Sequence, residues 1–134
     1  MDEALKAFYK AAELDPDWEW TYYFIGNVLS KQSKTDEALK AFQKAAELKP
    51  DWALPYCSIG ELLSEQDKMD EALKAFLKAA ELEPDSAIPY YEIGELLYKQ
   101  GKTDEALKNY QKAYRLKPDW NEPKERIEEI LKNR

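Results

Sequence analysis

Proline recurs in this chain at intervals of 34 residues, and that period limits the possible folds more than any other feature. The prolines in phase are Pro16, Pro50, Pro84 and Pro118. The segment Asp-Glu-Ala-Leu-Lys keeps the same period at 2–6, 36–40, 70–74 and 104–108. Such self-similarity is typical of arrays in which each unit packs only on its neighbours. The sequence therefore predicts one elongated stack of repeated units.

Local signals divide each unit into two helices. The second helix opens at Thr35 or Thr103, whose hydroxyl we expect to cap it, and the acids that follow suit the positive end of its dipole. The first helix has proline in its first turn, where the missing N–H costs little, at Pro55, Pro89 and Pro123. The joints between the two helices contain Ser33, Asp67 and Gly101, of which Gly101 and Asp67 can take a left-handed turn more easily than Ser33.

Glycine also keeps the period, at Gly26, Gly60 and Gly94. A glycine inside a helix is about 1 kcal/mol less favourable than alanine. Three glycines in one phase of the first helix therefore have a structural role. They predict that a neighbouring helix approaches closely at that position.

The constant residues resemble the tetratricopeptide repeat, in which an aromatic residue, Leu-Gly, a Tyr-like position, Ala, Phe, Ala and Pro recur in a fixed order. The first unit of the pattern, which the next two units repeat, is Tyr22, Ile25, Gly26, Leu29, Ala38, Phe42, Ala45 and Pro50. The resemblance covers the whole chain. It implies an all-α fold, a right-handed α-solenoid of antiparallel helix pairs. Pentatricopeptide repeats, which bind RNA, are similar but have a longer period and are usually basic.

We expect residues 1–134 to form a single domain. Its parts are a half repeat at 2–14, repeats at 19–48, 53–82 and 87–116, and a C-terminal capping helix at 121–133. In that last helix Lys124 and Glu128 replace the aromatic residue and the glycine, as a cap requires. The half repeat lacks an inner partner, so its apolar face is a candidate for homodimerisation or for contact with upstream repeats. That face comprises Leu5, Phe8, Ala11, Ala12 and Leu14.

The first helix of each unit has a constant face and a variable face. Residue types at Tyr22, Ile25, Gly26 and Leu29 are the same in all three units, whereas the opposite face changes at every position. In the family that the chain resembles, these first helices line a concave groove that holds a peptide. The resemblance therefore implies a peptide-binding groove formed by Trp20, Tyr23, Phe24, Asn27, Lys31, Leu54, Cys57, Glu61, Ile88, Tyr91, Glu95 and Tyr98.

The groove is predicted to be aromatic at one end and net acidic, which favours a ligand that combines apolar residues with Lys or Arg. One branch of the family binds acidic chaperone tails through a carboxylate clamp. Only Asn27 fits that clamp, because Tyr23, Ser58, Ile88 and Glu92 depart from it. We interpret Trp18, Trp52 and Trp120, which follow Pro-Asp at the joints, as residues that staple helix starts.

Composition excludes several other functions. The chain has no histidine, so it lacks the commonest general base and the usual zinc ligand, and we expect no catalysis, metal or cofactor. A net charge of −7 argues against nucleic acid as a partner. No apolar run is long enough to span a membrane, and one cysteine, Cys57, cannot form an internal disulfide. We expect a soluble, cytoplasmic protein that binds a protein or peptide; the alternative is a self-associating or engineered structural scaffold without a natural ligand.

Overall fold

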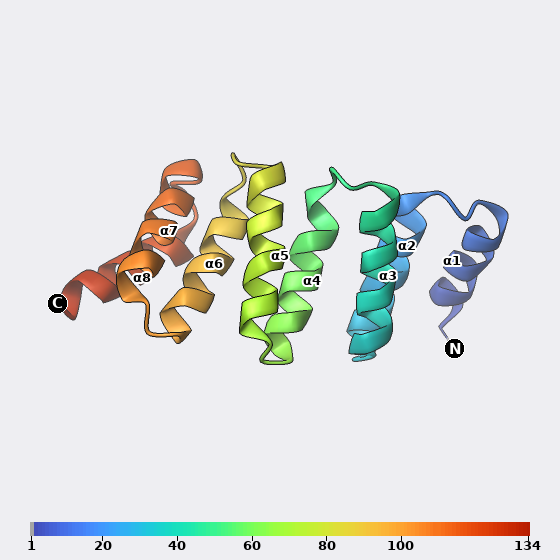
Figure 1. Ribbon diagram of the computed structural model, residues 1–134, viewed down its shortest axis with the longest axis horizontal. Helices are drawn as coiled ribbons and strands as arrows, with labels where there is room; N and C mark the ends of the chain where they lie inside the picture. The colour runs from blue at the N-terminus through green and yellow to red at the C-terminus, as the bar shows by residue number, and fades with distance from the viewer. Residues whose placement is uncertain (1) are drawn as a thin grey trace.

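The computed structural model describes residues 2–134, so Met1, which the repeat places in phase with Thr35, lies outside the described part of the chain. Residues 2–134 form eight α-helices and no strand. The helices are α1 (Glu3–Leu14), α2 (Glu19–Lys31), α3 (Thr35–Leu48), α4 (Ala53–Glu65), α5 (Met69–Leu82), α6 (Ala87–Lys99), α7 (Thr103–Leu116) and α8 (Asn121–Lys132). They follow one another along the long axis, with the two termini at opposite ends (Figure 1).

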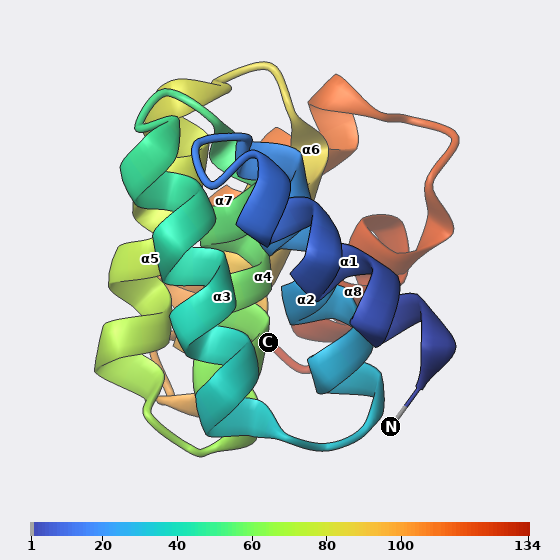
Figure 2. The same cartoon turned by 90° about the vertical axis from the view of Figure 1, so that its right-hand side faces the viewer.

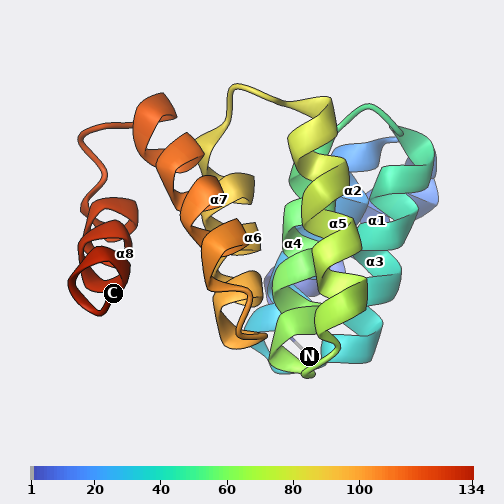
Figure 3. The ribbon, with the colours of Figure 1, turned by 60° about the vertical axis from the view of Figure 1, so that its left-hand side comes forward.

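The helices form two layers. Seen along the array, α3 and α5 lie on one side and α2 and α4 beside them (Figure 2). The turned view places α5 and α7 in front of α4 and α6 (Figure 3). Each helix packs on the helices that precede and follow it in the chain. This arrangement confirms the all-α solenoid, and no helix of residues 2–134 is long and apolar enough to cross a membrane.

Close packing at the repeated glycines joins the layers. A Cβ atom added to Gly26 would lie 2.6 Å from the ring of Phe42 on the next helix. The same approach recurs at 2.7 Å for Gly60 against Phe76 and at 2.8 Å for Gly94 against Tyr110. These three rings are almost fully buried. The predicted close approach of helices is therefore confirmed, and its cause is an aromatic ring seated on the glycine.

The turns between the helices of a pair are left-handed at all three joints. Asp67 has a φ of 63° and Gly101 a φ of 78°, and Ser33, the less favoured residue, has a φ of 61° as well. The predicted threonine caps are wrong, because Lys34 is the cap residue and Thr35 is already helical. The Lys34 carbonyl accepts the first hydrogen bond of α3, from the Ala38 N–H at 2.9 Å, so the helix begins one residue earlier than predicted. Thr103 is likewise the first helical residue of α7.

The apolar surface of α1 that no other helix covers is smaller than the sequence predicts. Leu5 is only 2% exposed, because it packs into the core cluster that includes α2, so α2 covers this member of the apolar face of α1. Ala4 and Leu14 are exposed, the latter by 76%. Ala38, which is in phase with Ala4, is fully buried against its own inner helix. The surface left uncovered on α1 is therefore the strip that an inner helix of the same unit would cover.

Candidate functional site

An aromatic cluster occupies the first part of the variable face. We define it as Phe8, Trp20, Tyr23, Phe24 and Trp52. The Phe8 and Phe24 rings stack with centroids 5.4 Å apart, and Trp20 lies 5.5 Å from Phe24. Trp52 lies 4.6 Å from Trp20 and 5.2 Å from Tyr23. The cluster joins α1, α2 and the start of α4 into one apolar surface, which rigid aromatic side chains keep in shape.

A polar network lies at the other end of the variable face. Glu95 accepts hydrogen bonds from Arg126, at 2.7 and 3.3 Å, and from the Tyr110 hydroxyl at 2.6 Å. Burial alone would raise the pKa of Glu95, but these hydrogen bonds and the Arg126 charge hold it below its usual value. Tyr91 lies beside the network, with its ring 4.8 Å from that of Trp120. The network ties α6, α7 and α8 together and leaves the Glu95 charge already paired.

Between these two ends the variable face opens into a hollow of about 380 Å³. Six of the predicted groove residues line it: Tyr23, Asn27, Leu54, Cys57, Glu61 and Ile88. Trp52, Glu83 and Ser86 also contribute to its walls. Leu54 and Ile88 are 40% and 48% exposed, so they present apolar surface at its rim. We call this hollow the middle pocket.

Two carboxylates, Glu61 and Glu83, line the middle pocket, and Glu92 lies close enough to Glu61 for their charges to interact. Partial burial, then the charges of Glu61 and Glu95, raises the pKa of Glu92 from 4.5 to about 7. Burial and Glu65 raise the pKa of Glu61 as well. Burial, followed by the charges of Glu61, Glu83 and Glu92, raises the pKa of Cys57 to about 12, so the thiol stays protonated near neutral pH. The Glu61 and Glu92 carboxylates therefore repel one another, and a cation placed beside them would relieve that repulsion.

The remaining predicted groove residues lie outside the middle pocket. Trp20 and Phe24 belong to the aromatic cluster, and Tyr91 and Glu95 to the far end. Tyr98 is half-buried with its ring edge-on to Tyr110, at 6.4 Å. Lys31 is exposed at the end of α2. The predicted set thus divides into an aromatic cluster, a pocket and a polar far end, with Lys31 apart from all three.

The sequence predicted that the tryptophans at the joints support helix starts, but it did not predict their contacts with the inner helices. Trp52 and Trp120 are cap residues of α4 and α8, but their rings pack on the preceding inner helix, against Tyr23 and Tyr91. Trp18, by contrast, is 48% exposed. A signal was present in the sequence, because each of the two packed tryptophans follows its tyrosine partner at the same spacing.

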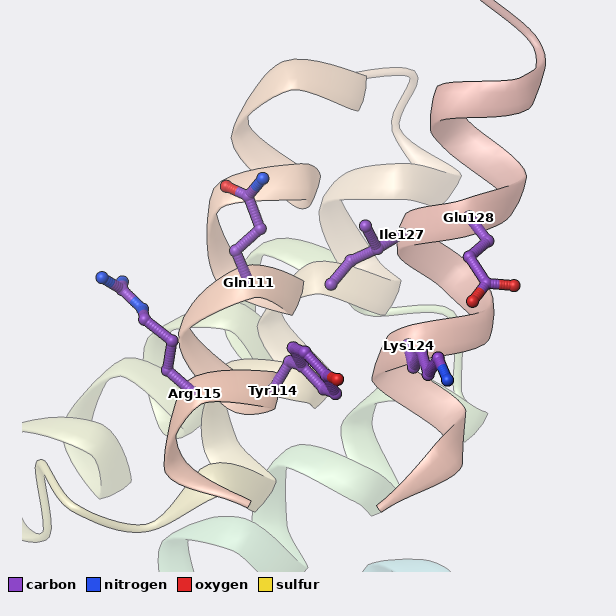
Figure 4. Close-up of a pocket in the computed structure, with 6 residues that line it drawn as sticks. All are labelled: Gln111, Tyr114, Arg115, Lys124, Ile127 and Glu128. Carbon is purple, nitrogen blue, oxygen red and sulfur yellow. The ribbon is translucent and has the colours of Figure 1, made fainter. Parts of the chain in front are cut away.

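A second hollow, of about 530 Å³, lies between α7 and α8 (Figure 4). Its lining residues are Gln111, Tyr114, Arg115, Lys124, Ile127 and Glu128. The α8 residues among them are in phase with the constant face of the other inner helices, so this hollow is not part of the variable face. Lys124 stands where those helices carry tyrosine, and its side chain replaces packed aromatic surface with charge. Across residues 2–134 no group of three or more His, Cys, Asp or Glu side chains could hold a metal ion.

Comparisons with known proteins match the fold and the repeat. Residues 53–119 match one family model described as tetratricopeptide repeat, and residues 20–51 match another. A crystal structure of MamA superimposes with a TM-score of 0.87 at 23% identity, covering 97% of this chain and 76% of MamA. YrrB, titled "a TPR protein with an unusual peptide-binding site", gives a TM-score of 0.85 at 27% identity, covering 96% of this chain and 66% of YrrB. No curated protein sequence matches the chain.

Proposed function

We propose, from the premise that this chain belongs to the tetratricopeptide repeat family, that it binds a peptide segment of a partner protein along the variable face of its inner helices. The family and the fold support a protein-interaction scaffold. The observation that carries the proposal is the contrast between the two faces of those helices. The constant face carries the packing, whereas the variable face has an aromatic cluster, a pocket and unpaired acidic charge.

The ligand is a segment that combines apolar side chains with Lys or Arg. Leu54 and Ile88 offer exposed apolar surface at the pocket rim, and covering it is favourable by about 25 cal/mol per Å². Glu61 and Glu92 repel one another, so a cation placed between them is attracted by both. We propose a non-catalytic role, which is supported by the protonated Cys57 thiol and by the lack of histidine. The single cysteine, which has no partner for an internal disulfide, supports the cytoplasm as the proposed location.

The test is selection from a random peptide library, followed by rebinding to variants. The double variant Leu54→Ser/Ile88→Ser removes apolar surface at the rim without entering the core. We expect the selected peptides to be rich in Lys or Arg and apolar residues, and to lose binding to this variant. The matched control is Leu77→Ser, since Leu77 is 51% exposed but lies on the outer helix α5. Acidic selected peptides, or equal loss in both variants, would contradict the proposal.

A second candidate function is self-association through α1. Ala4 and Leu14 are exposed there, whereas the alanine in phase with Ala4, Ala38, is fully buried. Exposed apolar surface of this kind favours a covering partner, and a second copy of the chain is one. Sedimentation of the chain beside Ala4→Glu/Leu14→Glu tests this. A wild-type chain that stays monomeric at high concentration would rule out the dimer.

A further inference from the structure

The three junctions between successive inner helices can be compared position by position, because the repeat places the same residues in the same phase. At the first junction Tyr23 packs on Trp52, with ring centroids 5.2 Å apart. At the last junction Tyr91 packs on Trp120, at 4.8 Å. At the middle junction the corresponding residues are Cys57 and Ser86, and both line the middle pocket. The pocket is therefore the place where a repeated aromatic pair is replaced by two small side chains.

Charge differs at the same junction. At the last junction Glu95 pairs with Arg126, at 2.7 Å. One repeat earlier the corresponding residues are Glu61 and Glu92, so two carboxylates stand where the neighbouring junction has an ion pair. They are close enough that Glu61 raises the pKa of Glu92. The middle junction thus lacks both the aromatic group and the cation that its neighbour contains.

We propose that the middle pocket is an anchor site for an aromatic side chain that stands next to Lys or Arg in the bound peptide. The aromatic ring takes the space left by Cys57 and Ser86, beside the Trp52 ring and the apolar rim. The adjacent cation lies between Glu61 and Glu92 and pairs with their carboxylates, as Arg126 pairs with Glu95 at the last junction. Aromatic residues in well-packed pockets are the usual hot spots of such interfaces.

This inference rests on the proposed function and specifies the part of the face that discriminates between ligands. Two small probes isolate it from the rest of the groove. Tryptamine carries an indole ring and an ammonium group, whereas indole-3-propionate carries the same ring and a carboxylate. We expect tryptamine to shift the amide signals of Cys57, Glu61 and Ser86 in a two-dimensional NMR spectrum, and indole-3-propionate to leave them in place.

Refilling the pocket supplies the decisive variants. Cys57→Tyr/Ser86→Trp restores the pair found at both neighbouring junctions, and Glu92→Arg restores the neighbouring ion pair. Both copy contacts that the fold already contains, so thermal unfolding should show each variant to be folded. We expect the refilled pocket to abolish the tryptamine shifts and to weaken library-selected peptides by about tenfold or more. The matched control is Leu77→Tyr, which adds an aromatic ring to the outer layer and should change neither.

The outcomes separate the two proposals. One outcome is that selected peptides bind the refilled variant as well as the wild type but still lose affinity for Leu54→Ser/Ile88→Ser. That result would contradict the anchor site and would still support peptide binding along the variable face. Equal shifts from both indole probes would overturn the role of the carboxylates. If the library yields no binding peptide at all, the proposed function fails, and the anchor site fails with it.

Discussion

Glu92 makes the folded chain sensitive to pH, and the effect can be worked out from its surroundings. Partial burial is the largest cause, and Glu61 and Glu95 add repulsion, while Lys99 offsets part of it. Together they raise the pKa of Glu92 from 4.5 to about 7. Between these two values the folded chain binds more protons than the unfolded chain. Its free energy of unfolding therefore falls as pH rises through this window and stays low above it.

The pKa shift of Glu92 sets an upper limit on this change in the free energy of unfolding. One pKa unit corresponds to about 1.4 kcal/mol, so the full displacement would be worth about 3 kcal/mol. Glu92 is only half-buried, and solvent around it relaxes part of the penalty. We therefore expect Glu92→Gln to raise the free energy of unfolding by about 1–2 kcal/mol at pH about 8, and to change it little at pH about 5.

Urea denaturation of the wild type and the variant across that pH range is the measurement. Glu125→Gln, which removes an exposed carboxylate from α8, is the control for a change in net charge. It should shift the curve by no more than about 0.5 kcal/mol at any pH. The reasoning is refuted if Glu92→Gln is not stabilising at the higher pH, or if the wild-type free energy is flat between pH about 5 and about 8.

Three further outcomes follow from the same contacts. Gly60→Ala should destabilise by about 1–3 kcal/mol despite the better helix propensity of alanine, because its Cβ would lie 2.7 Å from the Phe76 ring. Denaturation of Gly60→Ala/Phe76→Leu should show less than the additive loss, and an additive loss would contradict the contact. Arg126→Met should lower the free energy of unfolding by about 1–2 kcal/mol near neutral pH, because Glu95 loses its partner. Thermal melts should show this loss becoming smaller in acid, because Glu95 is protonated below its lowered pKa and then no longer forms the ion pair. Calorimetric titration of a Lys-containing selected peptide should show binding that strengthens as pH rises towards 8 and weakens with added salt.

Most of the fold could be predicted because the residues that pack the helices recur at the same positions in every unit. The glycine phase predicted a close contact, and the structure shows an aromatic ring on each of the three glycines. The residue types at the joints favoured left-handed turns at Asp67 and Gly101, and the structure shows one at Ser33 too. The threonine caps were wrong, because a hydroxyl residue near a helix start does not show which carbonyl accepts the first hydrogen bond of the helix, and here it is that of Lys34.

The site was harder to predict than the fold. Helical periodicity shows which residues share a face, but it does not show how far one unit is displaced along the next. That displacement brings Trp52 onto Tyr23 and Arg126 onto Glu95. A joint residue such as Trp52 belongs to no helical face, so its position predicts only a support for the helix start. These contacts required the structure.

The repeat also explains how one junction can be hollow without loss of the fold. In a linear array each unit contacts only its neighbours, so stability is close to a sum of local terms. At the middle junction the constant face remains intact, with Gly60 seated on the buried ring of Phe76. An aromatic pair contributes about 0.5–1.5 kcal/mol beyond its buried area. Replacing one such pair by Cys57 and Ser86 therefore lowers the free energy of unfolding by an amount that is small beside the contribution of the other contacts. It leaves a pocket that no aromatic ring of residues 2–134 fills and two carboxylates that no cation of those residues pairs with.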